Sequence, residues 1–217
     1  MKSKAVIFDL DGTLFNSIAD IAASCNKMLK NHGFKTYSEK DYLKWIGNGA
    51  YKLVERALKA SVPDLTKEVV LPYLMEYNQL YLEHCTEKSE VYDGIPFLLD
   101  ELTNRKVLLN INTNKPQEIT EKVVQHYFAK WKFIHVIGQQ GGGVKKPDPT
   151  AALFIAHDLK RPPSEIFFVG DSDVDAQTGK NAGMPTVGVT WGYRKITRET
   201  GFDFLVNTPE ELLKIIG

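Results

Sequence analysis

A long helical interval, from about residue 16 to residue 84, interrupts an otherwise regular alternation of strands and helices in this sequence. Ahead of it, residues 4–10 form a short β-branched and aromatic run that ends at the turn signal Asp11-Gly12. Further strand-like runs come after the interval, at 107–113, 133–137, 165–170 and 185–190, with 204–207 as a candidate edge. The pattern therefore indicates one sheet-containing domain whose sequence is interrupted by a helical insert after the first strand.

The alternating part predicts an α/β fold. Amphipathic stretches such as 117–128 and 149–159 separate the strand-like runs, a pattern typical of a doubly wound parallel sheet with helices on both faces. We expect residues 1–15 and 86–217 to form this core and residues 16–85 to form an inserted all-helical domain.

Within the insert, apolar residues recur at helical spacing, which predicts core packing between helices. The predicted stripes are Ile18, Ile21, Ala22, Cys25 and Leu29; then Leu53, Val54, Ala57 and Leu58; and then Leu71, Leu74, Met75 and Leu82.

The composition is that of an ordinary soluble protein and excludes several partners. The 27 Lys and Arg residues balance 27 Asp and Glu residues, so no net charge attracts nucleic acid or an anionic membrane. No apolar run reaches the roughly 20 residues that a membrane span needs. Cys25 and Cys85 are too few for a disulfide framework, and we expect two reduced thiols in a cytoplasmic protein.

Polar side chains gather after the predicted strands, where an open parallel sheet places its active site. They are Asp9, Asp11, Gly12 and Thr13 after the first strand; Thr113, Asn114 and Lys115 after the second; Lys145 and Lys146 ahead of a later helix; and Asp171, Asp173 and Asp175 after the fourth. Hydroxyls, lysines and carboxylates from separate parts of the chain thus converge on one rim.

Carboxylates placed this close together need a cation to offset their repulsion. Two carboxylates about 4 Å apart repel by roughly 4 kcal/mol at an effective dielectric constant near 20. Oxygen ligands without a Cys or His cluster favour Mg²⁺ over zinc. Magnesium with nearby Lys and Thr suits phosphoryl transfer, in which Asp9 can act as the nucleophile and Asp11 as the acid and base.

The segment Asp9-Leu10-Asp11-Gly12-Thr13-Leu14 resembles the first motif of the haloacid dehalogenase (HAD) superfamily. Its other motifs are matched in order by Thr113-Asn114, by Lys146-Pro147, and by Gly170-Asp171-Ser172 with Asp175. The resemblance spans nearly the whole chain and implies a Rossmann-like HAD core with a helical cap.

The resemblance also implies a role for each matched residue. Asp9 would be the nucleophile and a metal ligand, and Asp11 the acid/base, lending Mg²⁺ a backbone carbonyl. Thr113 and the Asn114 amide would hold the phosphoryl group, and Lys146 would neutralise it. Asp171 would complete the metal ligands, with Asp175 behind them holding water or Lys146. Lys146 is preferred to Lys145 because the family lysine directly precedes proline. Asp173 is expected to be an exposed or capping residue.

The predicted cap carries a second resemblance. The segment from Trp45 through Gly47, Asn48 and Gly49 to Leu58 is similar to the corresponding part of bacterial phosphoglycolate phosphatases, although its glycines could simply make a turn. The loop 139–143, with Gly141 to Gly143, has no family counterpart that we can identify. The expected activity is hydrolysis of a small phosphomonoester, with 2-phosphoglycolate as the leading candidate.

Three alternatives stay open at this point: a β-phosphoglucomutase-like phosphomutase, a pyrophosphatase, and a non-catalytic phosphate-responsive binding protein. In each case we expect a small phosphorylated metabolite as the partner, with no nucleic acid and no membrane, in a monomer or homodimer.

Overall fold

The computed structural model describes residues 4–141 and 143–217, and it divides the chain into two compact units. Unit 1 consists of the described part of Met1–Asn16 together with Val91–Gly217, and unit 2 is Ser17–Glu90. Of the loop 139–143 singled out in the sequence, Gly142 lies outside the described residues.

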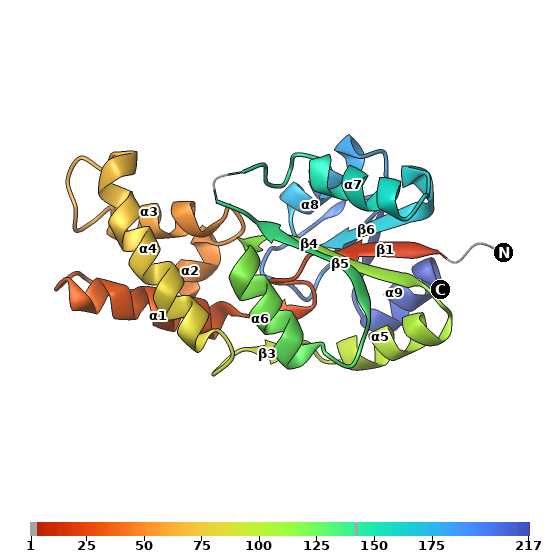
Figure 1. Cartoon of the computed structure of the whole chain (residues 1–217), viewed down its shortest axis with the longest axis horizontal. Coiled ribbons are helices and arrows are strands. Elements are labelled where there is room, and N and C mark those ends of the chain that lie inside the picture. Colours follow the sequence, from red (N-terminus) through yellow and green to blue (C-terminus); the bar gives the residue numbers. More distant parts are fainter. Residues whose placement is uncertain (1–3, 142) are drawn as a thin grey trace. The chain divides into compact units, whose positions relative to one another are not determined.

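Unit 1 is built on a six-stranded sheet with the strand order β5-β4-β1-β6-β7-β8 (Figure 1). Its strands are β1 (Ala5–Phe8), β4 (Leu108–Pro116), β5 (Phe133–Gln139), β6 (Ile166–Gly170), β7 (Thr186–Val189) and β8 (Phe204–Val206). All neighbouring pairs in this sheet are parallel, so the predicted α/β fold class is confirmed. β1 is central and fully buried, which is why it reads as a continuous apolar run without alternation.

Helices cover both faces of this sheet. They are α5 (Ile95–Asn104), α6 (Gln117–Tyr127), α7 (Thr150–Asp158), α8 (Asp173–Asn181) and α9 (Pro209–Ile216). In Figure 1, α7 and α8 lie above the sheet, and α5, α6 and α9 lie below it. The core under α7 joins Ala5 and Ile7 of β1 to Phe168 of β6 and Ile155 of the helix. This packing on both faces fixes the positions of the strand ends.

A two-stranded sheet, which the sequence analysis did not predict, lies where the chain passes between the units. It pairs β2 (Phe15–Asn16) with β3 (Glu90–Val91). Strands of two residues are too short to show any hydrophobic period, so no sequence pattern announces them.

Unit 2 contains the helices α1 (Ile18–Asn31), α2 (Glu39–Trp45), α3 (Ala50–Leu58) and α4 (Lys67–His84). The predicted stripes on the first and third of these helices are buried. The stripe on α4 was wrong: Leu71 and Met75 are 38% and 71% exposed, while Tyr77 and Tyr81 are buried instead. Amphipathic tyrosines, which bury their rings, displace the aliphatic residues from the packed face.

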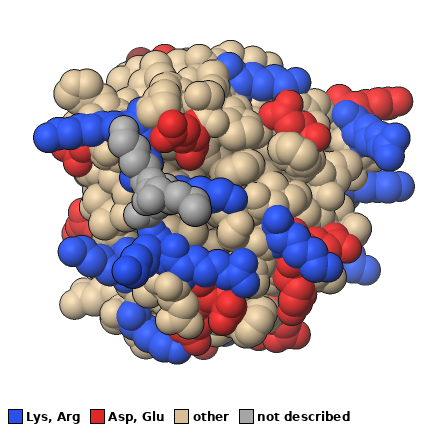
Figure 2. Space-filling view, turned by 90° about the vertical axis from the view of Figure 1, so that its right-hand side faces the viewer, with Lys and Arg blue, Asp and Glu red and all other residues tan. Residues whose placement is uncertain are grey.

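The surface charge of one face follows the balanced composition. Figure 2 shows Lys and Arg interspersed with Asp and Glu on the face that carries the chain ends in Figure 1. Among the described residues, no helix is both long and apolar enough to cross a lipid bilayer.

Candidate active site

The strand ends of unit 1 bring the predicted polar residues to one edge of the sheet. Asp9 follows β1 directly, and Asp171 follows β6, the neighbour of β1. Thr113 and Asn114 lie near the carboxyl end of β4, the other neighbour of β1. Because parallel strands end on the same side, residues more than a hundred positions apart in the sequence meet here.

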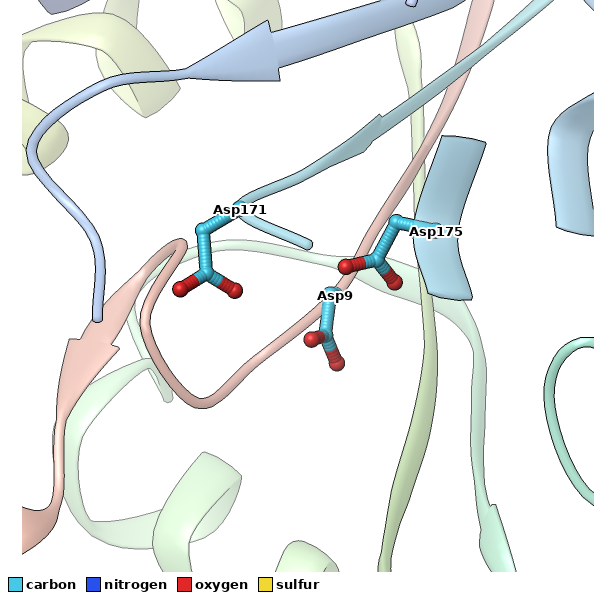
Figure 3. A group of neighbouring side chains, drawn as sticks. All are labelled: Asp9, Asp171 and Asp175. Carbon is cyan, nitrogen blue, oxygen red and sulfur yellow. The ribbon is translucent and has the colours of Figure 1, made fainter. Parts of the chain in front are cut away.

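Three carboxylates form the centre of this edge. Asp9, Asp171 and Asp175 are all buried, and each offers an oxygen within 4.8 Å of the others. Figure 3 shows their carboxylate groups turned toward a shared space, with Asp9 and Asp171 on loops after strands and Asp175 on α8. These residues could therefore hold a metal ion.

Asp175 has both of its oxygens engaged by the protein. Its Oδ1 lies 2.6 Å from Lys146 Nζ, and its Oδ2 accepts hydrogen bonds from the Ser172 amide at 3.1 Å and the Ser172 hydroxyl at 2.6 Å. The Ser172 contacts form a capping box at the start of α8. Asp175 is therefore built to orient Lys146, and it is the weakest candidate of the three for direct metal binding.

Only one of the two carboxylate oxygens of Asp9 has hydrogen-bond donors among the described residues. Its Oδ1 accepts from the Leu10 amide at 2.7 Å and lies 2.8 Å from Lys146 Nζ. No described residue donates a hydrogen bond to Oδ2. Burial raises the pKa of Asp9 to about 6, because desolvation outweighs the attraction of the Lys146 ammonium.

Asp171 is similarly short of donors. Its Oδ2 accepts from the Tyr193 amide at 2.7 Å, and its Oδ1 has no donor among the described residues. Burial, reinforced by the nearby charges of Asp175 and Asp9, raises the pKa of Asp171 to about 8. Among the described residues, Asp171 has no ion-pair partner, and Asp9 shares the Lys146 ammonium with Asp175, so the negative charge of the three carboxylates is only partly offset.

Two glycines allow the backbone to pack against Asp171. A Cβ added to Gly12, which has a φ of 85°, would lie 2.4 Å from Asp171 Oδ2. A Cβ on Gly192 would lie 2.3 Å from the Asp171 Cβ. Any side chain at either position would displace this carboxylate, so both glycines are required by close approach.

Lys146 is enclosed by carboxylates. Its side chain is 2% exposed and contacts both Asp9 and Asp175. Burial alone would lower its pKa, but the charges of Asp175 and Asp9 raise it above the ordinary value, so the ammonium stays protonated. Lys145, the alternative considered from the sequence, is exposed.

Asp11 has a different partner. Its carboxylate oxygens lie 2.8 and 3.2 Å from Nζ of Lys115, whose side chain is 1% exposed. Asp11 is not part of the cluster of Asp9, Asp171 and Asp175, so its contribution of a backbone carbonyl to the metal stays a prediction. Lys115 was expected on this rim from its place after a predicted strand, but its pairing with Asp11 across 104 residues has no local sequence signal.

Asn114 joins β4 to the loop that carries Lys146, and Thr113 bonds within β4. The Asn114 side chain donates to the Lys146 carbonyl at 3.1 Å and accepts from the Lys146 amide at 2.8 Å. The hydroxyl of Thr113 accepts from the Lys115 amide at 3.3 Å. The side chain of Asn114 thus positions Lys146, and the contact of Asn114 with a phosphoryl group stays a prediction.

The remaining predicted site residues are less directly placed. Asp173 is exposed in the first turn of α8, as expected. In unit 2, Gly47 and Gly49 have φ angles of 98° and 88°, and Arg56 donates to Asn48 Oδ1 at 3.0 Å. These glycines meet the needs of a tight turn ahead of α3, and their contact with substrate stays a prediction.

The donor set fits a hard divalent cation. Asp9 Oδ2 and Asp171 Oδ1 are buried carboxylate oxygens without donors among the described residues, and their pKa values are raised by burial and like charge. A cation with a preference for oxygen would supply the missing positive charge. Asp9 and Asp171 are therefore the side chains that would hold it.

Comparisons with known proteins agree with the motif pattern. Residues 6–189 match the haloacid dehalogenase-like hydrolase family. A phosphoglycolate phosphatase from Aquifex aeolicus is 33% identical over 213 residues, covering 98% of this chain and 96% of the relative. An N-acetylmuramic acid 6-phosphate phosphatase from Pseudomonas aeruginosa is 31% identical over 219 residues, covering 100% and 96% respectively.

A solved structure is similar over its whole length. The crystal structure of a protein assigned as a phosphoglycolate phosphatase from Lactobacillus delbrueckii subsp. bulgaricus has a TM-score of 0.90 and 28% sequence identity. The match covers 100% of this chain and 99% of that chain.

Proposed function

The chain belongs to the haloacid dehalogenase-like hydrolase family, and on that premise we propose that it is a Mg²⁺-dependent phosphatase that hydrolyses a small phosphomonoester through an aspartyl-phosphate. The observation that carries the proposal is the state of Asp9. It lies at the end of the central strand with one oxygen fixed by Lys146 and the other without a donor among the described residues. A carboxylate held in this way can attack with Oδ2.

The first step forms a bond between Asp9 Oδ2 and phosphorus as the ester P–O bond breaks. Asp11 gives its proton to the departing alkoxide, and Lys115 fixes the orientation of the Asp11 carboxylate. Lys146 stays protonated and offsets charge on the phosphoryl oxygens, with Asp175 holding it in place.

The second step returns the enzyme to its starting state. Water attacks phosphorus, Asp11 takes its proton, and the bond from phosphorus to Asp9 Oδ2 breaks to release inorganic phosphate. Mg²⁺, held by Asp171 and by the oxygen of Asp9 that does not bond to phosphorus, would neutralise phosphoryl charge when bound. All other positioning comes from the side chains described above.

The substrate proposal is 2-phosphoglycolate, supported by the names of several relatives at 30% identity or above. A second candidate is N-acetylmuramic acid 6-phosphate, supported by the relative of 31% identity that is named for it. Both are phosphomonoesters that carry a carboxylate, so the same reaction serves either one. The resemblance of 45–58 to phosphoglycolate phosphatases favours the first, with Gly47, Asn48 and Gly49 as proposed substrate contacts.

A substrate panel tests this proposal. Phosphate release would be measured with 2-phosphoglycolate, N-acetylmuramic acid 6-phosphate, pyrophosphate and hexose phosphates, each with Mg²⁺ and with EDTA. We expect the largest kcat/KM on 2-phosphoglycolate, loss with EDTA, and loss in Asp9→Asn. A bisphosphate requirement without phosphate release would instead identify a phosphomutase. Binding of these compounds without any turnover would identify a binding protein.

A further inference from the structure

One buried carboxylate lies far along the chain from the catalytic motifs. Asp20, in the first turn of α1, is 1% exposed. Its Oδ2 accepts hydrogen bonds from the amides of Glu87 and Ser89 at 3.2 and 3.0 Å, and from the Ser89 hydroxyl at 2.6 Å. The amide of Lys88 is shared between its two oxygens at 3.0 and 3.1 Å.

This arrangement is an anion site filled from within the chain. Three successive backbone amides, 87 to 89, point at one carboxylate, as in the backbone nests that bind anions. The N-terminal end of α1 adds favourable dipole charge, because Asp20 occupies its first turn. Among the described residues, no lysine, arginine or histidine forms an ion pair with Asp20, so these amides and the helix end offset its charge.

The hydrogen bonds of Asp20 join the two ends of unit 2. The chain enters unit 2 between residues 16 and 17 and leaves it between residues 90 and 91. Asp20 lies just after the first crossing and residues 87–89 lie just before the second. The carboxylate therefore fastens the last residues of unit 2 to its first helix, close to the paired strands β2 and β3.

We propose that Asp20 is a positioning residue for the phosphatase reaction: it fixes residues 87–89, the last part of unit 2, against α1, so that unit 2 keeps one conformation up to its last residues. This inference rests on the proposed function in requiring that unit 2 contributes to substrate binding. We call the hydrogen bonds between Asp20 and residues 87–89 the clamp. Without the clamp, residues 85–89 would become flexible, and a smaller fraction of the protein molecules would have the conformation that binds substrate.

The expected kinetic signature is a change in KM. When the binding-competent arrangement is populated to a fraction f, the apparent dissociation constant rises by 1/f. We therefore expect Asp20→Ala to raise KM about tenfold. A residue that only stabilised the fold would lower the amount of active enzyme and leave KM unchanged.

The test combines kinetics with hydrogen exchange on the full chain. In Asp20→Ala we expect the amides of residues 87–89 to exchange at least about tenfold faster, while amides in the middle of α1 and α4 keep their wild-type rates. Mg²⁺ affinity should stay within about twofold of wild type, because Asp9 and Asp171 belong to unit 1. Asp41→Ala is the matched control, since Asp41 is also a first-turn carboxylate in unit 2 but binds Ser38; it should leave KM unchanged.

The outcomes separate the clamp from the proposed function. Unchanged exchange at 87–89 overturns the clamp, and faster exchange with an unchanged KM overturns the positioning role. A wild-type protein without phosphatase activity overturns the proposed function, and with it the positioning role, while the exchange data still decide whether the clamp exists. If Asp20→Ala fails to fold, Ser89→Ala removes the hydrogen bond from the Ser89 hydroxyl to Asp20 and should give a smaller change of the same kind in both readouts.

Discussion

Asp171 in unit 1 and Asp20 in unit 2 are both buried carboxylates, but the protein surrounds them in opposite ways. Both oxygens of Asp20 accept hydrogen bonds, from three backbone amides and a hydroxyl. Asp171 accepts from one backbone amide and lies beside Asp9 and Asp175.

The number of hydrogen-bond donors around each carboxylate distinguishes a buried charge that stabilises the fold from one that is available to bind a ligand. A buried carboxylate to which the fold supplies hydrogen-bond donors has its hydrogen-bonding capacity satisfied in the folded protein. A buried anion left short of donors next to like charge raises the free energy of the folded state until a cation binds. Asp171 and Asp9 are of this second kind, and both have raised pKa values.

The largest expected effect is on turnover. Asp9→Asn preserves the shape of the side chain but removes the nucleophilic charge, and we expect kcat to fall by about 10⁴-fold. The measurement is phosphate release under saturating Mg²⁺ and substrate. Asp173→Asn, an exposed neighbour of the site, is the control and should retain activity. An active Asp9→Asn variant would remove Asp9 from the reaction.

A second expectation concerns the cation that the site already contains. Lys146→Met would leave Asp9 and Asp175 without their shared ammonium, so we expect the free energy of unfolding to fall by about 3–5 kcal/mol. Lys145→Met changes an exposed lysine and should have an effect of less than about 0.5 kcal/mol. Equal effects of the two variants in urea denaturation would show that Lys146 does not balance these carboxylates.

The two buried carboxylates should respond to the same isosteric change with opposite signs. Without Mg²⁺, Asp171→Asn relieves repulsion and should raise the free energy of unfolding, on the order of 1–3 kcal/mol. Asp20→Asn replaces charge-assisted hydrogen bonds by neutral ones and should lower it by a similar amount. Urea denaturation in EDTA measures both. Destabilisation by both variants would mean that the fold satisfies Asp171 as it satisfies Asp20.

A further expectation is a trend of stability with pH. A carboxyl group with a raised pKa in the folded state contributes stability below its ordinary pKa, near 3.8, and loses it as pH rises. The Mg²⁺-free protein should therefore lose stability from about pH 4 through about pH 6 for Asp9 and about pH 8 for Asp171.

Melting temperatures measured across this range, with EDTA or with Mg²⁺, test the trend. Mg²⁺ should stabilise the protein more at pH 8 than at pH 6, because it binds the ionised carboxylates. Asp171→Asn should flatten the upper part of the EDTA curve. An increment from Mg²⁺ that is independent of pH in the wild type would contradict this assignment of the ligands.

The sequence predicts the parts of this molecule that depend on local pattern. β1 and β6 are apolar runs that Asp9 and Asp171 follow directly, so the places of these two residues at one edge of the sheet could be predicted, whereas Lys146 was singled out through the resemblance to the family. Their proximity followed from the geometry of parallel strands. The α4 face was predicted wrongly because tyrosine can bury its ring as well as leucine does.

Contacts between distant residues left no local pattern. Lys115 is paired with Asp11 across 104 residues, and Asp20 meets the 87–89 amides across 67 to 69. The requirement for glycine at 192 comes from the close approach of Asp171. Each of these depends on how the chain closes on itself, which neither periodicity nor motif spacing contains.

The central claim is that Asp9 and Asp171 form an electrostatically incomplete pair which Mg²⁺ and a phosphoryl group complete. A crystal structure grown with Mg²⁺ and beryllofluoride, a mimic of the phosphoryl group, tests it directly. We predict beryllium bonded to a carboxylate oxygen of Asp9 and Mg²⁺ coordinated by Asp9 and Asp171. A structure in which beryllofluoride does not attach to Asp9, or in which Mg²⁺ binds without Asp171, would contradict the claim.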